Sequence, residues 1–142
     1  MEKSVMGFLE SPKLLTKEGV LSLSPLVLAF IGDAVYSLYI RTKIVAQKNQ
    51  SVNFLHKETI KYVKAKAQAE SIKRIYDLLS EEEKDIVRRG RNMKSNTTPK
   101  GVEVQAYRYA TGFEALLGYL YLAGEYKRLK NILELSVQVI EE

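Results

Sequence analysis

Cysteine is absent from the 142-residue sequence, and histidine occurs once, as His56. Without cysteine the protein has no disulfide, thiolate nucleophile, iron–sulfur cluster or cysteine-liganded zinc. A single histidine also excludes a metal site built from several imidazoles. If a metal binds, oxygen atoms must be its ligands, which favours Mg²⁺ or Mn²⁺. We interpret His56 itself as a structural residue or a polar surface contact.

Long uncharged apolar runs and targeting signals are also missing. No run reaches the roughly 20 uncharged residues that a membrane-spanning helix needs. The first residues, 1–7, lack the apolar region and the cleavage site of a signal peptide. We therefore expect a soluble, cytoplasmic protein. The length suits one domain over residues 1–142, in which residues 1–23 form a weakly ordered lead-in or a short helix.

Strand-like alternation, internal repeats and low-complexity segments are absent too, so the predicted fold class is all-α. Ser24 and Pro25 predict a helix start, with serine as the cap and proline in the first turn, and this helix should reach residues 45–47. The spacing of Ser80 and Glu83 predicts a capping box. That box opens a short helix, which we expect to stop near Gly90.

The remaining helix boundaries follow from caps and breakers. Asn53 is the expected cap of the next helix, and the small residues of 65–69 predict a bend within it. After a polar loop over residues 91–101, a helix is expected from about Val102 to Ala123. Gly124 then ends it, and a last helix follows.

Two of these helices are core-like apolar runs that each contain one acid. Residues 26–40 have Asp33 as the only acidic residue, and residues 109–124 have Glu114 as the only charge. An ionised carboxylate inside a buried helix costs several kcal/mol, roughly, unless a cation or strong donors meet it. The two runs together therefore suggest a metal site shared by Asp33 and Glu114.

Each acid also has a simpler interpretation. Gly32 and Asp33 together could break the first helix, with Asp33 capping the second half or pairing with a buried arginine. Thr111 and Glu114 have the spacing of a capping box, although the apolar pattern through this segment favours a continuous helix. The glycines inside the two runs, Gly32 and Gly118 among them, are typical of helices that approach one another closely.

Basic residues are concentrated in one segment of the chain. The net charge is +5, and residues 88–108 contain six basic residues against one acid, Glu103. A solvated surface is the simplest interpretation of such a segment. Its arginines, amides and hydroxyls also suit phosphate groups, and the sequence therefore predicts contacts to a nucleic-acid backbone. The candidate residues are Arg88, Arg89, Arg91, Asn92, Lys94, Ser95, Thr97, Lys100 and Arg108.

Several motifs resemble one known family. Residues 30–35, Phe-Ile-Gly-Asp-Ala-Val, look like the signature of the ribonuclease III family, and residues 111–121 resemble its second acidic helix. Residues 65–69 and 89–92 are similar to segments of its short branch, Mini-ribonuclease III, which lacks a double-stranded-RNA-binding domain. The resemblance extends from about residue 24 to residue 140.

The resemblance implies a ribonuclease III-like endonuclease domain, a helical bundle that forms a homodimer, with no RNA-binding domain appended. It implies Mg²⁺-dependent cleavage of double-stranded RNA to 5′-phosphate and 3′-hydroxyl ends, and maturation of precursor 23S ribosomal RNA. By position, Asp33 and Glu114 match the family's catalytic, metal-binding acids. The tyrosines at helical spacing are expected in the core or in interfaces rather than stacked on bases.

The chain also departs from the longer members of the family. Those members usually carry acids where this chain has Ala29 and Thr111. The number of metals per site therefore stays open, as does any need for a ribosomal protein helper. Two other functions remain: a non-catalytic RNA-binding ribosome-assembly factor with the same fold, and a helical protein-interaction domain with an incidental basic face.

Overall fold

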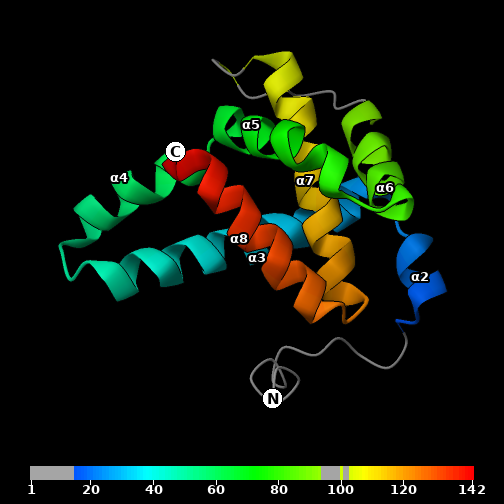
Figure 1. Ribbon diagram of the computed structural model, residues 1–142, viewed down its shortest axis with the longest axis horizontal. Helices are drawn as coiled ribbons and strands as arrows, with labels where there is room; N and C mark the ends of the chain where they lie inside the picture. The colour runs from blue at the N-terminus through cyan, green and yellow to red at the C-terminus, as the bar shows by residue number, and fades with distance from the viewer. Residues whose placement is uncertain (1–14, 94–99, 101–102) are drawn as a thin grey trace.

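The structure is a computed structural model that describes residues 15–93, 100 and 103–142. Within these ranges every regular element is a helix, which confirms the all-α prediction. Figure 1 shows α7 in the middle of the molecule, while the end of α3 and all of α4 form an arm that projects to one side. The elements are α2 (Lys17–Leu21), α3 (Pro25–Gln47), α4 (Val52–Val63), α5 (Ala65–Ile75), the short 3-10 helix η2 (Tyr76–Leu78), α6 (Glu81–Asn92), α7 (Val104–Leu122) and α8 (Tyr126–Glu141).

The core is organised around α7, which packs against α3, α5, α6 and α8. A helix that is apolar on nearly all sides is stable only when other elements cover it. Phe113, Leu116 and Leu117 of α7 are completely buried, and the ring of Phe113 meets Tyr36 of α3 edge-on at 5.2 Å between centroids. The apolar run around Glu114 is therefore the centre of the core.

Two predicted helix starts are confirmed. Ser24 Oγ accepts a hydrogen bond from the Leu26 amide at 3.1 Å, and Pro25 is the first residue of α3. Ser80 and Glu83 form the expected reciprocal capping box at the start of α6. Gly124, with φ of 75°, follows the end of α7 as predicted. Each of these starts and stops depends on local side-chain or backbone chemistry.

Three predicted boundaries are wrong by one or two residues. Ser51 rather than Asn53 caps α4, because its Oγ accepts from the Phe54 amide at 3.2 Å. The expected bend lies at Lys64, whose extended backbone (ψ 149°) separates α4 from α5. Helix α6 continues through Gly90 to Asn92, since the absence of a side chain at Gly90 lets α6 pack against α7.

The alternatives in which the acids cap broken helices are wrong. Helix α3 runs without interruption through Gly32 and Asp33. Helix α7 begins at Val104 and passes through Thr111, whose hydroxyl donates to the Tyr107 carbonyl, one turn earlier in the same helix, at 3.0 Å. Both acids are therefore helix-interior residues, as the apolar pattern indicated.

Glycines set the distance between α3 and α7. A Cβ atom at Gly32 would overlap the carbonyl oxygen of Glu114, and one at Gly118 would overlap the carbonyl oxygen of Leu28. Backbone therefore lies against backbone at both points. This confirms the interpretation of these glycines as sites of close helix approach, and it places the acid-bearing segments side by side.

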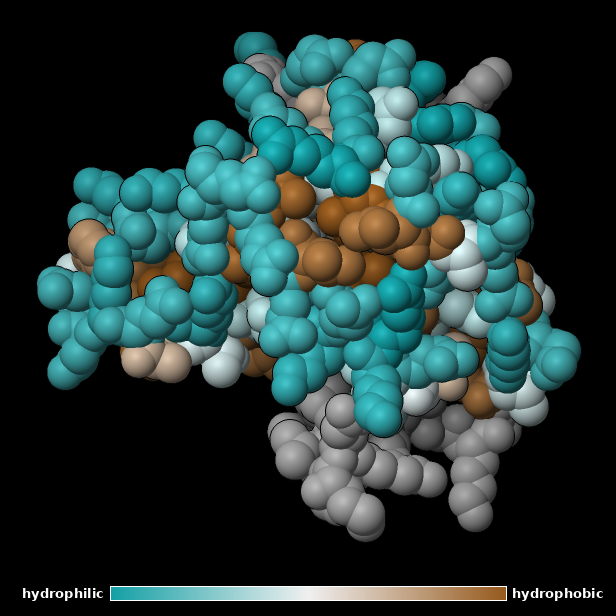
Figure 2. Space-filling model, viewed as in Figure 1, coloured by the Kyte–Doolittle hydropathy of each residue, from teal (hydrophilic) through white to brown (hydrophobic). Residues whose placement is uncertain are grey.

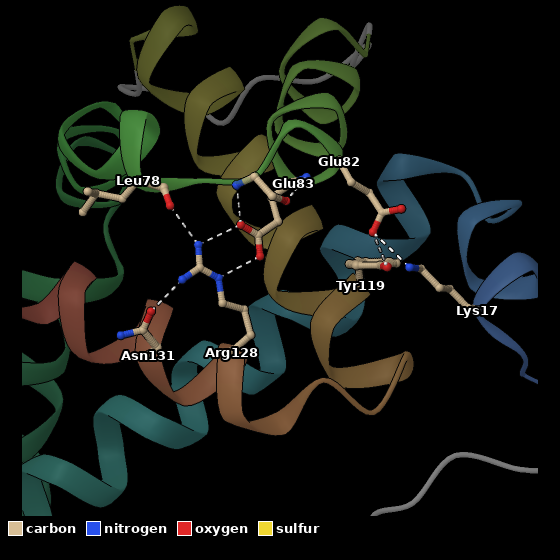
Figure 3. Close-up of polar contacts among 8 residues, drawn as sticks. Lys17, Leu78, Glu82, Glu83, Tyr119, Arg128 and Asn131 are labelled. Atoms are coloured by element: carbon tan, nitrogen blue, oxygen red, sulfur yellow. Dashed lines mark hydrogen bonds and ion pairs between the residues drawn. The ribbon is translucent and has the colours of Figure 1, made fainter.

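A polar network fastens the start of α6 to the last helix (Figure 3). Arg128 of α8 donates from Nε and Nη2 to the two carboxylate oxygens of Glu83, both at 2.8 Å, and also to the Leu78 carbonyl at 2.9 Å. The forked bond holds the pKa of Glu83 below its ordinary value. Beside it, the Tyr119 hydroxyl donates to Glu82 at 2.9 Å. The arrangement is structural, because the charges satisfy one another.

Hydropathy varies across the surface of the described part of the chain. On the side seen in Figure 2, hydrophilic side chains cover most of the molecule, and a narrow band of hydrophobic residues crosses its middle. In the described part of the chain, no helix is both long enough and apolar enough to cross a bilayer.

Candidate metal centre and nucleic-acid interface

The two predicted acids meet where α3 crosses α7. Asp33 follows Gly32, whose Cα lies against the backbone of Glu114, and the carboxyl groups of Asp33 and Glu114 are within hydrogen-bonding contact. The prediction that the two helices bring these side chains together therefore agrees with the geometry. One expectation is corrected: Glu114 is half-buried, whereas Asp33 lies on an exposed face of α3.

The electrostatics of the pair are unfavourable for two negative charges. Burial, and then the neighbouring charge of Asp33, raise the pKa of Glu114 from 4.5 to about 8. A carboxyl group with a raised pKa beside a second carboxylate is typical of functional sites. A bound cation removes the repulsion, because its positive charge stabilises both ionised groups at once.

A third side chain joins the pair from α5. Gln68 is 2% exposed, and its Nε2 donates to Glu114 Oε2 at 3.2 Å and to the Val63 carbonyl at 2.8 Å. Sequence reasoning assigned no role to Gln68. The available signal was a single amide within the small-residue stretch 65–69, between Ala67 and Ala69.

The positions where longer family members carry further acids contribute no ligand. Ala29 is buried in the core, and the Thr111 hydroxyl is used by the Tyr107 carbonyl. Among the residues that the structure describes, no cluster of three or more histidines, cysteines or acids is suited to hold a metal. The candidate centre therefore consists of two carboxylates, an all-oxygen donor set that fits Mg²⁺ or Mn²⁺, with the Gln68 amide hydrogen-bonded to one of them.

The predicted phosphate-binding residues are only partly brought together. Arg88, Arg89, Arg91 and Asn92 share the last two turns of α6, whereas Arg108 projects from the start of α7. All but Arg91 are exposed, as is Lys100. The predicted contacts Lys94, Ser95 and Thr97 lie outside the described residues.

The arginines of α6 have different surroundings. Arg88 lies 3.5 Å from both Asp85 and the Tyr76 hydroxyl, so part of its charge is already balanced. Arg89 is exposed and has no ion pair among the contacts of the described residues. Arg91 lies over the ring of Tyr109, and Lys73 of α5 approaches the same ring at 4.5 Å. Lys73 is a cation near this surface that the sequence prediction missed.

The end of α6 packs against the segment of α7 that carries Glu114. Gly90 packs against Gly112 of α7, where an added Cβ at Gly90 would lie 2.9 Å from the Gly112 Cα. Gly112 precedes Glu114 by two residues. One segment of α7 therefore contacts α3 through Glu114 and α6 through Gly112, on different sides of α7 because residues two positions apart in a helix point in nearly opposite directions.

Comparison with known proteins identifies the fold. A family model described as "Ribonuclease III domain" matches residues 26–125, the part of the chain that contains both acids. The chain belongs to the ribonuclease III family. Within this family it is 94% identical over 142 residues to a protein of Thermoanaerobacter sp. (strain X514) named Mini-ribonuclease 3, with full coverage of both chains.

More distant matches support the same family assignment. A Mini-ribonuclease 3 of Clostridium tetani (strain Massachusetts / E88) is 51% identical over 128 residues, which cover 89% of this chain and 85% of that protein. A crystal structure of a protein from Fusobacterium nucleatum superposes with a TM-score of 0.75 at 35% identity, covering 82% of this chain and 93% of the other. The resemblance seen in the motifs is thereby confirmed.

Proposed function

We propose that the protein is a Mg²⁺-dependent endoribonuclease that cuts double-stranded regions of precursor 23S ribosomal RNA in the cytoplasm. The observation that carries this proposal is the pairing of Asp33 with the half-buried Glu114 at the α3–α7 crossing. Membership of the ribonuclease III family supports the reaction class, and the Mini-ribonuclease 3 relatives support assignment to the same branch.

The residues at the crossing suit a hard divalent cation. Asp33 and Glu114 hold the ion through carboxylate oxygens, and the repulsion between them favours its binding. When bound there, the ion would supply positive charge to the attacking water and to the departing 3′-oxygen, the chemistry that hydrolysis to 5′-phosphate and 3′-hydroxyl ends requires. Gly32 and Gly118 keep the two acids at a fixed separation, because backbone contact leaves no room for the helices to slide.

The cationic end of α6 would hold the RNA. Arginine and lysine bind phosphate oxygens without reading bases, which suits recognition of a double helix by its A-form shape. Arg89, Arg91 and Arg108 are the described residues that we expect to contribute most. Arg88 contributes less because Asp85 already balances part of its charge.

A nuclease assay tests the proposal. Wild type is expected to cut an end-labelled RNA duplex only when Mg²⁺ or Mn²⁺ is added, and end-mapping of precursor 23S RNA should give discrete ends. Asp33→Asn and Glu114→Gln should each lower the cleavage rate at least a hundredfold while RNA binding persists. Full cleavage by Asp33→Asn would contradict the catalytic assignment.

The lack of acids at Ala29 and Thr111 favours one alternative, a non-catalytic RNA-binding ribosome-assembly factor. The same assay separates the two functions, because such a factor binds the duplex but leaves it intact at every Mg²⁺ concentration. If precursor RNA is cut only after ribosomal proteins are added, the proposed nuclease activity is supported and a ribosomal protein acts as its helper.

The RNA surface is tested by salt dependence. Replacing Arg89 and Arg91 by glutamine removes two charges but keeps most of the side-chain packing. We expect weaker binding and a shallower slope of log affinity against log salt, by about one unit for each phosphate group that is no longer neutralised. Lys127→Gln with Lys130→Gln, two exposed positions on α8, removes the same charge elsewhere and should leave the slope nearly unchanged. Equal slopes for the two double variants would contradict the proposed surface.

A homodimer is part of the proposal. Helix α3 exposes Leu26, Val27, Phe30 and Leu38 at 40%, 46%, 77% and 57% of their surfaces. Apolar side chains gathered on one helix are typical of a protein–protein interface. A second copy on this face would lie close to Asp33, which follows Phe30 by three residues on the same helix.

A further inference from the structure

Gln68 is the only buried amide side chain among the described residues. It lies between Ala67 and Ala69, which are also buried, and Ile72 follows one turn later with no exposed surface. An apolar side chain of the same length would fill this position without desolvating an amide. Packing alone therefore does not explain why a polar amide occupies this buried position.

The hydrogen bonds of Gln68 fix the orientation of its amide. The Val63 carbonyl can only accept, so the nitrogen must face it, and the 2.8 Å bond anchors the amide to the backbone. This carbonyl is available because the break at Lys64 interrupts the helical ladder. The same nitrogen then reaches Glu114 Oε2 at 3.2 Å.

This orientation leaves the other polar atom of Gln68 without a partner. Its Oε1 is buried and accepts no hydrogen bond from the residues that the structure describes. A buried acceptor without a donor destabilises the folded protein, because its hydrogen bond to water is lost and not replaced. The amide nitrogen of Gln68 therefore makes two hydrogen bonds while the amide oxygen makes none. One of the two bonds is to Glu114, a candidate metal ligand.

We propose that Gln68 is a positioning residue. Its amide links Glu114 to the carbonyl of Val63, the last residue of α4, and so fixes the orientation of the Glu114 carboxylate for cation binding. This inference rests on the proposed function. By binding Oε2, the amide restricts the rotation of the glutamate side chain and leaves Oε1 for the ion. Partners of this kind orient metal ligands, and their removal commonly weakens metal affinity about 10–100-fold.

The test uses Gln68→Met, which keeps the length and burial of the side chain but cannot donate. Mn²⁺ binding to the RNA-free protein is measured by electron paramagnetic resonance. The Mg²⁺ concentration for half-maximal cleavage and the melting temperature are measured alongside. We expect Mn²⁺ affinity to fall about tenfold and half-maximal Mg²⁺ to rise to match, with little change in the melting temperature.

Ser71→Ala is the matched control. Ser71 is a second completely buried polar residue of α5, and it donates to the Ser136 carbonyl at 2.9 Å rather than to the candidate centre. Its replacement should lower the melting temperature and leave Mn²⁺ affinity unchanged. Gln68→Asn, one methylene too short to join Val63 to Glu114, is the second variant and should lose Mn²⁺ affinity as Gln68→Met does.

The outcomes separate this inference from the proposed function. If wild type neither binds Mn²⁺ nor cuts RNA, the proposed function fails. If wild type does both and the two Gln68 variants bind Mn²⁺ as tightly as wild type, only the positioning role is overturned. Loss of Mn²⁺ affinity in the Ser71→Ala control as well would also overturn it, because general loosening of α5 would then explain the effect.

Discussion

Glu114 shows how burial and one neighbour change the chemistry of a single side chain. Its carboxyl group accepts a hydrogen bond from the amide of Gln68, and its pKa is raised to about 8, first by burial and then by Asp33. Ionisation near neutral pH therefore needs an added positive charge. The metal would supply that charge, so its binding and the release of a proton are coupled.

This coupling predicts a pH-dependent stability in metal-free protein. Between pH 4.5 and about 8, folded Glu114 keeps a proton that the unfolded chain has released, so unfolding is favoured as the pH rises. The contribution is fully present below pH 4.5 and is lost as the pH rises through about 8. Urea unfolding in EDTA should show a loss of up to about 1.4 kcal/mol per pH unit from this group. Added Mg²⁺ should restore stability at pH 8.

Two variants serve as controls for that measurement. Glu114→Gln cannot ionise, so its stability should lack this component of the pH dependence. Asp33→Asn should remove only part of it, because burial is the larger cause and remains. A Glu114→Gln profile parallel to that of wild type between pH 5 and 8 would show that Glu114 has an ordinary pKa.

At the scale of helices, the α3–α7 contact is the most constrained part of the fold. An added Cβ at Gly118 would overlap the Leu28 carbonyl oxygen, which belongs to the backbone and cannot rotate away. Gly118→Ala should therefore destabilise the protein by about 3 kcal/mol or more through overpacking, although alanine gains about 1 kcal/mol in helix propensity. Urea unfolding measures this loss, and cleavage should fall because the acids move apart.

Gly90→Ala is the comparison within the same fold. Its Cβ would lie 2.9 Å from the Gly112 Cα and 3.1 Å from the Ala115 Cβ, a milder overlap than at Gly118. We expect a smaller loss of stability, and cleavage that is better preserved. Equal stability of Gly118→Ala and wild type would mean that the two helices are free to separate.

Local chemistry explains which helices the sequence alone could predict. Ser24 and the Ser80–Glu83 box are read correctly because a cap needs only its own next few residues. Asn53 is mistaken for a cap because Ser51 competes two residues earlier, and propensity alone does not rank the two. Gly90 does not stop α6 because its packing against α7, a contact invisible in sequence, favours continuing the helix.

The candidate site divides in the same way. Asp33 and Glu114 are recognisable because a charge inside an apolar helical pattern is conspicuous, and the pattern also indicates that both helices are continuous. That Asp33 is exposed is not recognisable, because the pattern does not show which apolar face another element covers. Gln68 has no sequence signal of its own: its role depends on the carbonyl that the break at Lys64 leaves available.

At the scale of the whole molecule, the exposed side of α3 is the main feature that one chain leaves unexplained. Five large apolar residues of this helix, Val45 included, are 40–77% exposed, and Asp33 lies among them. Covering this face with a second copy would bury the apolar residues and bring two candidate centres into one assembly. A two-fold dimer would suit a duplex, whose two strands are related by approximate two-fold symmetry.

Phe30→Glu tests this arrangement. Because Phe30 is 77% exposed, a charge there should cost the single chain little stability but should prevent a second copy from docking. Analytical ultracentrifugation should give the mass of two chains for wild type and of one chain for Phe30→Glu, with cleavage of the duplex strongly reduced. Val52→Glu is the matched control, since Val52 is 81% exposed and belongs to α4 rather than to α3. A wild-type monomer, or a Phe30→Glu protein that keeps the mass of two chains, would refute an α3 dimer interface.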